Sequence, residues 1–237
     1  MVILVAGLVV AAGALVQGTV GFGMALLAAP LLAVLDPAFV PVPLLVLALT
    51  HAVLTFGREN SDTDWRGVGW AMLGRLPGTA AGVLAVAALS ARAFSAVVAL
   101  TVLACAALSV LRWRLRPTPA ALVTAGAFSG AAGTASSIGG PPVALLYQNE
   151  RGPRVRATLA AYFVLGTILS IASLAAAGQV TADNLRTGAL LVPFMIAGFL
   201  LSGPARRLLD RGWTRPAVVG LAAAGAFALL VRAAVGA

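Results

Sequence analysis

Residues 136–148 of the chain read SSIGGPPVALLYQ, an apolar run preceded by two glycines and two prolines. Proline suits the first turn of a helix, where no backbone N–H is needed, so Pro141 and Pro142 predict a helix start here. A helix from Pro141 to Gln148 rises about 12 Å, which is less than half of a bilayer core. In a chain that spans a bilayer, this helix would begin at membrane depth.

The composition indicates that the chain does span a bilayer. Of 237 residues, 61% are hydrophobic and 10% are charged, and the mean hydropathy is +1.02. Soluble domains are about 45–50% apolar and about 25% charged. The charges occur in short clusters, separated by apolar stretches of roughly 15–25 residues that fit a bilayer core. We therefore predict an all-α polytopic membrane protein.

Apolar runs predict ten membrane segments. They cover 2–16, 21–35, 39–57, 66–89, 93–111, 118–132, 136–149, 155–177, 186–206 and 215–235. Four of them fall short of the roughly 20 residues that a spanning helix needs, namely 2–16, 21–35, 118–132 and 136–149. We expect these four to form short re-entrant or broken helices.

An internal repeat organises the ten segments. The glycines of residues 18–21 and Pro30 align with the glycines of residues 130–133 and Pro142 at a constant offset of 112. The repeats then cover 1–116 and 117–237 within one membrane domain, with five segments each. An odd number of segments makes the second repeat enter the membrane from the opposite side. The pattern predicts two inverted-topology repeats whose short helices stand at the repeat starts.

The arginines follow the same topology. All sixteen basic residues are arginine, and a cytoplasmic loop at 57–66 places twelve of them on the cytoplasmic side. Only Arg92, Arg186 and Arg232 then lie on the outer side. This bias is the positive-inside rule, and it explains the net charge of +9 without a nucleic-acid partner. The single Cys105 cannot form an internal disulfide or a thiolate metal cluster, and no metal or cofactor is expected.

Several motifs resemble those of the sulfite exporter TauE/SafE family of membrane transporters. They are QGTVGFG at 17–23 with APLL at 29–32, GAAG at 130–133 with IGGPPV at 138–143, and RATL at 156–159 followed by Tyr162-Phe163. The resemblance covers essentially the whole chain. It implies movement of a small anion, such as sulfite, an organosulfonate or a related small carboxylate. It also implies the inner (plasma) membrane of a bacterium.

The glycine-rich turns are candidate anion sites. Irregular backbone survives at membrane depth only when it is buried in protein or lines a wet cavity. Free N–H groups and the helix dipole at a helix start attract anions. The candidate residues are Ser136, Ser137, Gly139, Gly140 and Pro141 in the second half, and Gly21, Phe22 and Gly23 in the first. The alternative is that these glycines only permit close helix packing.

Arg75 is a second candidate for substrate binding. It lies about ten residues into the 66–89 segment, roughly 15 Å deep at the rise of a helix. An arginine there costs at least about 2.5 kcal/mol, so it normally faces a cavity or a partner. We expect Gly78 and Gly82 on the same helix face to leave room for water or ligand. The alternative is a structural cation held by the carbonyls of a helix end.

His51 and Tyr162 complete the candidate site. His51, Thr55 and Arg58 form a polar stripe on an otherwise apolar helix. A histidine can carry a proton in coupled transport, although the same pattern fits a buried histidine that only makes structural hydrogen bonds. Tyr162 is a candidate hydrogen-bond donor to an oxyanion.

These features predict a secondary transporter that works by alternating access around a midplane site, and not an enzyme. A chain without lysine lacks a P-loop for ATP hydrolysis. A negative cytoplasm favours anion export. The predicted partners are a small anion and the lipid bilayer, while a co-transported proton or other ion and a homo-oligomer are left open. Two alternatives remain: an intramembrane serine hydrolase that uses Ser136 or Ser137 with His51, and a non-transporting membrane subunit.

Overall fold

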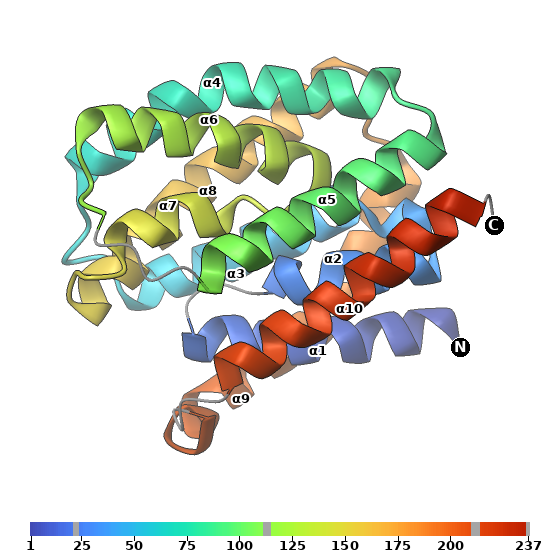
Figure 1. Ribbon diagram of the computed structural model, residues 1–237. Coiled ribbons are helices and arrows are strands. Elements are labelled where there is room, and N and C mark those ends of the chain that lie inside the picture. Colours follow the sequence, from blue (N-terminus) through green and yellow to red (C-terminus); the bar gives the residue numbers. More distant parts are fainter. Residues whose placement is uncertain (21–23, 111–114, 210–213, 236–237) are drawn as a thin grey trace.

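The computed structural model describes residues 1–20, 24–110, 115–209 and 214–235, and this part of the chain is helical (Figure 1). Its helices are α1 (Val2–Val20), α2 (Met24–Leu35), the 3-10 helix η1 (Pro37–Phe39), α3 (Val42–Arg58), α4 (Trp65–Ala88), α5 (Ala91–Val110), α6 (Pro119–Ser136), α7 (Gly140–Tyr147), α8 (Gly152–Ala176), α9 (Ala182–Leu209) and α10 (Thr214–Val235).

Each of the ten predicted segments corresponds, in chain order, to one α-helix, so the all-helical prediction is confirmed for the described residues. The helices α1 and α6, with 19 and 18 residues, are longer than expected. In contrast, α2 and α7 are short, with 12 and 8 residues. Five spans in the described chain are long and apolar enough to cross a membrane: Pro37–Arg58, Trp65–Ala88, Ala91–Leu108, Gly152–Ala176 and Ala182–Ala205.

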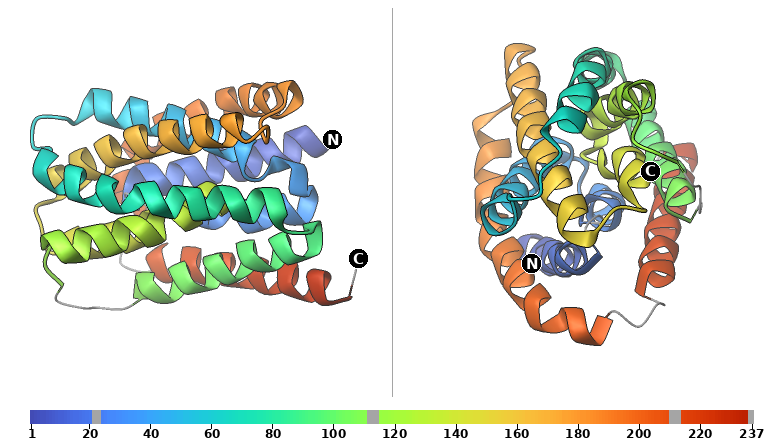
Figure 2. Two further views of the ribbon diagram at one scale, coloured as in Figure 1. Left: turned by 90° about the horizontal axis from the view of Figure 1, so that it is seen from above. Right: turned by 90° about the vertical axis from the view of Figure 1, so that its left-hand side faces the viewer.

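The helices lie side by side along one axis, and their connections gather at two ends of the bundle (Figure 2, left). One end holds the α3–α4 connection at 59–64, the start of α6 and the α7–α8 connection at 148–151, and we call it the arginine-rich end. The start of α1, η1 and the α8–α9 connection lie at the other end.

The packing follows a repeated pattern. Helix α4 packs along α6, and α1 packs along α9. Helix α3 packs against α8 and α9, while α10 packs against α5 and α2. The short helices α2 and α7 each follow a long helix, α1 and α6 respectively, and pack back against it.

Glycines bring α4 and α6 into close contact. A Cβ atom added at Gly78 would overlap the backbone carbonyl oxygen of Ala127, and one added at Gly74 would overlap that of Val123. At Gly82 an added Cβ would stand 2.7 Å from Thr134 Cβ. Small residues allow helix backbones to approach this closely in membranes. The expectation that Gly78 and Gly82 leave room for water or ligand is therefore wrong, because α6 fills that space.

Candidate functional site

A central cavity lies inside the helical bundle. It holds about 1030 Å³ of atom-free space, its open mouth included, and residues of α1, α2, α3, α4, α6, α7, α8 and α9 line it. Its polar lining away from the mouth consists of Gln17, His51, Thr55, Arg75, Ser137 and Thr167. The remaining wall is largely apolar, as in most small-molecule sites.

Arg75 of α4 is the charged group in the depth of this cavity, and its side chain is held by two serines. The residue is only 2% exposed. Its Nη1 lies 3.3 Å from Ser129 Oγ of α6, and its Nη2 lies 3.3 Å from Ser170 Oγ of α8. Among the residues that the structure describes, no carboxylate lies within 4.0 Å of it. Hydroxyl groups therefore solvate the guanidinium without neutralising its charge.

Aromatic and glycine contacts shape the space around this guanidinium. Its Cζ lies 5.0 Å from the centroid of the Tyr162 ring, a distance typical of a cation–π contact. A Cβ atom at Gly133 would stand 3.2 Å from Nη2, and one at Gly166 would stand 2.7 Å from Nη1. Glycine at both positions therefore gives the arginine side chain its room.

The short helix α7 begins inside the bundle, as the two prolines predict, one residue earlier than Pro141. Its first residues Gly139, Gly140 and Pro141 line the cavity. The carbonyl oxygen of Gly139 accepts a hydrogen bond from Ser129 Oγ, the same hydroxyl that contacts Arg75. The start of α7 and the buried arginine are thus joined through one serine.

The two predicted serines are engaged with the backbone. Ser137 lines the cavity in a left-handed conformation (φ 64°), and its Oγ donates to the carbonyl oxygen of Pro41 at 3.0 Å. Ser136 Oγ donates to the carbonyl oxygen of Ala132 at 2.8 Å. Both hydroxyls therefore donate to backbone carbonyl groups, and within the described chain neither bonds to His51, the partner that the hydrolase alternative needs.

His51 and Tyr162 occupy different positions relative to the cavity. His51 lines the wall, with Nδ1 3.4 Å from Thr55 Oγ1 and its ring edge-on to Phe199 at 5.0 Å. Tyr162 is fully buried beneath Arg75, and its hydroxyl has no hydrogen-bond partner in the described chain. A buried hydroxyl without a partner is costly, so Tyr162 remains a candidate donor.

The first-half candidates Gly21, Phe22 and Gly23 lie outside the described residues. The residues on either side of them are described. The side-chain oxygen of Gln17 accepts the backbone N–H of Met24 at 3.0 Å, at the start of α2, and both residues line the cavity.

Sequence reasoning missed the side chains that support the starts of the short helices. Gln17 and Ser129 stand at the repeat offset of 112, and each bonds the backbone at the start of α2 or α7. The repeat alignment therefore contained a usable signal, since it pairs two polar residues at equivalent positions of the two halves. Ser170 and Thr167 gave no such signal, because polar residues on a helix do not reveal which neighbour they face.

The mouth of the cavity lies at the arginine-rich end. Arg58 and Glu59 at the end of α3 line it, together with Arg156 of α8. Arg156 Nε lies 2.5 Å from Glu59 Oε2. Toward the other end, Val42, Leu45 and Leu174 form a buried apolar cluster. Among the described residues, the exposed lining of the cavity thus lies at the arginine-rich end, and this apolar cluster packs toward the other end.

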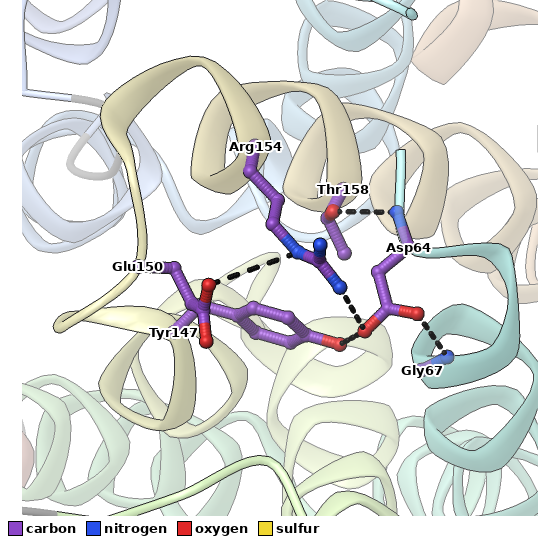
Figure 3. Close-up of polar contacts among 6 residues, drawn as sticks. All are labelled: Asp64, Gly67, Tyr147, Glu150, Arg154 and Thr158. Atoms are coloured by element: carbon purple, nitrogen blue, oxygen red, sulfur yellow. Dashed lines mark hydrogen bonds and ion pairs between the residues drawn. The ribbon is translucent and has the colours of Figure 1, made fainter. Parts of the chain in front are cut away.

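A polar cluster centred on Asp64 fixes the helices around this mouth (Figure 3). The Asp64 carboxylate accepts the backbone N–H of Gly67 at 3.0 Å and the Tyr147 hydroxyl at 2.9 Å. Its backbone N–H donates to Thr158 Oγ1 at 3.0 Å, and Arg154 lies 3.6 Å from the carboxylate. The cluster ties the start of α4 to the end of α7 and to α8.

Comparison with known proteins agrees with this architecture. Residues 5–229 match the family described as sulfite exporter TauE/SafE. A comparison with curated proteins and one with solved structures give no match. The family match spans nearly the whole helical bundle, including both short helices and the central cavity. The chain therefore belongs to the sulfite exporter TauE/SafE family and is a multi-pass membrane transporter protein.

Proposed function

We propose that this protein is a secondary transporter for a small anion such as sulfite, an organosulfonate or a related small carboxylate, with Arg75 as its main anion contact. The observation that carries the proposal is the state of Arg75: a guanidinium 2% exposed, at the cavity and without a carboxylate partner among the described residues. A buried cation is costly unless it is paired. A bound anion supplies the missing charge.

The start of α7 supplies further donors for the same anion. Gly139 and Gly140 present backbone N–H groups at a helix start, where the dipole favours negative charge. The Tyr162 ring lies 5.0 Å from Arg75 Cζ, and its hydroxyl has no hydrogen-bond partner within the described chain. In this proposal Ser137 and Pro141 shape the wall of the site, and Ser136 bonds the Ala132 carbonyl within the last turn of α6, just before the site. By the repeat alignment we also propose Gly21, Phe22 and Gly23, which lie outside the described residues, as first-half contributors to substrate binding.

The helix pairing supports alternating access between two inverted repeats. Under the repeat alignment α1 corresponds to α6 and α4 to α9, and the structure pairs α4 with α6 as it pairs α9 with α1. Such a pairing is what two related halves produce when each contributes one helix to the other. Among the described residues, the exposed part of the cavity lining lies at the arginine-rich end, as expected for a single conformation of an alternating-access cycle.

The distribution of charge supports outward transport, and the position of His51 supports a coupled proton. With the arginine-rich end in the cytoplasm, as the positive-inside rule places it, the membrane potential drives anions outward. We therefore propose an exporter in the inner membrane of a bacterium. His51 lines the cavity beside Thr55 and is the candidate for a co-transported proton.

Flux measurements on purified protein test this function. The protein is reconstituted into liposomes without ATP, and uptake or counterflow is measured for sulfite, sulfoacetate, other sulfonates and small carboxylates. We expect saturable flux of at least one of these anions. If none of them moves above the rate of empty liposomes, the proposal is contradicted and the non-transporting subunit is favoured.

A further inference from the structure

Three charged side chains from two helices surround the mouth of the cavity. Arg58 and Glu59 stand at the end of α3, and Arg156 stands near the start of α8. Arg156 Nε lies 2.5 Å from Glu59 Oε2, and the Arg58 guanidinium lies 4.2 Å above the Phe199 ring. A ligand that enters from the arginine-rich end therefore meets these two arginines and the carboxylate before it reaches Arg75.

The Glu59–Arg156 pair differs from the deep site in its exposure. The two side chains are 26% and 29% exposed, whereas Arg75 is 2% exposed. Partly exposed ion pairs hold together weakly because water competes for both charges. A carboxylate on a guanidinium also occupies the position that any other oxyanion would take, since arginine binds carboxylates and tetrahedral oxyanions through the same N–H donors.

We propose that Arg156, with Arg58 beside the same opening, forms a second anion-binding site at the mouth of the cavity, and that Glu59 occupies this site as a tethered competitor. The transported oxyanion displaces the Glu59 carboxylate, binds Arg156 and passes on to Arg75. Because Glu59 is attached to α3, it competes at a high and constant effective concentration. This inference rests on the proposed function, since it requires that an anion enters the cavity.

The substitution Glu59→Gln tests the competition, because it keeps the shape of the side chain and removes its charge. We expect KM to fall about fivefold for the anion of the above panel that the wild type transports fastest. A fivefold change corresponds to the free energy of a typical partly exposed ion pair. The apparent affinity for the anion rises because the anion no longer has to displace the Glu59 carboxylate from Arg156. The variant Glu59→Asp has a shorter side chain that contacts Arg156 less well, so it should also lower KM, but by a smaller factor.

A matched control is available at the same end of the bundle. Glu150 also pairs with an arginine, Arg154, at 3.8 Å, but it does not line the cavity. Glu150→Gln should keep the wild-type KM. Equal decreases in KM for the Glu59 and Glu150 variants would indicate a general effect of surface charge and would overturn the second site.

The partner substitution separates a binding site from a structural brace. Arg156→Gln should raise KM, and adding Glu59→Gln to it should cause no further change, because the competitor then has no site. If Glu59→Gln lowers the melting temperature and the maximal rate but leaves KM unchanged or raises it, the pair is a brace and the inference is wrong. Failure of the wild type to transport any anion would instead contradict the proposed function itself.

Discussion

Gly166 of α8 lies directly against the guanidinium of Arg75, so that a Cβ atom at position 166 would overlap Nε and Cζ and stand 2.7 Å from Nη1. Arg75 is held on its other sides by Ser129, Ser170 and the Tyr162 ring. The absence of a side chain at position 166 is therefore one of the features that set where the charge lies in the cavity.

The first prediction follows from this contact. Gly166→Ala should displace the guanidinium and reduce anion transport at least about tenfold, because overpacking a tight site typically costs 1–3 kcal/mol and shifts side chains. The measurement is initial flux in proteoliposomes. Gly69→Ala is the control, since Gly69 on α4 has no atom within 4 Å of an added Cβ, and it should transport like the wild type. Normal flux in Gly166→Ala would show that the position of Arg75 is not critical.

The second prediction concerns the contact of α4 with α6. Gly78→Val should lower the melting temperature markedly in detergent, because its Cβ would overlap the Ala127 carbonyl oxygen and the two backbones would have to separate. Gly69→Val makes the same glycine-to-valine change on the exposed face of the same helix, so it should change the melting temperature little. Similar melting temperatures for the two variants would contradict the tight pairing of these helices.

The third prediction concerns the Asp64 cluster of Figure 3. An added Cβ at Gly67 would overlap the Tyr147 hydroxyl, so Gly67→Ala should destabilise the protein. Tyr147→Phe alone loses one hydrogen bond to Asp64 and should cost about 1–3 kcal/mol. The double variant Gly67→Ala/Tyr147→Phe should lose less stability than the two single variants together, because phenylalanine lacks the hydroxyl that clashes with the added Cβ. Additive losses in thermal unfolding would mean that the two residues do not meet.

Much of the fold was predictable because apolar runs and their breakers are local features. Pro141 and Pro142 indicated the start of α7 to within one residue. The distance of Arg75 from the start of its segment singled it out as a candidate, and the structure buries it at the cavity. These features depend on short stretches of chain whose preferences do not need tertiary contacts.

The partners across helices were not predictable from one sequence. From the sequence, the face of α4 that carries Gly78 fits a cavity wall and a helix-packing surface equally well. Only the position of α6 in the structure shows that it is a packing surface. Glu59 and Arg156 are 97 positions apart, and nothing local to either residue indicates the other. The contacts of Ser129 and Ser170 with Arg75 were not predictable for the same reason, because the two serines lie on other helices, α6 and α8.

The most direct test of the central claim is the flux of anions through Arg75→Ala in proteoliposomes, beside the wild type at equal protein content. The variant should elute from size exclusion as the wild type does, because it removes a buried charge that no described carboxylate compensates. We predict that it carries no flux above empty liposomes for any anion that the wild type transports. Wild-type flux in the folded Arg75→Ala variant would contradict the account and remove Arg75 from the site.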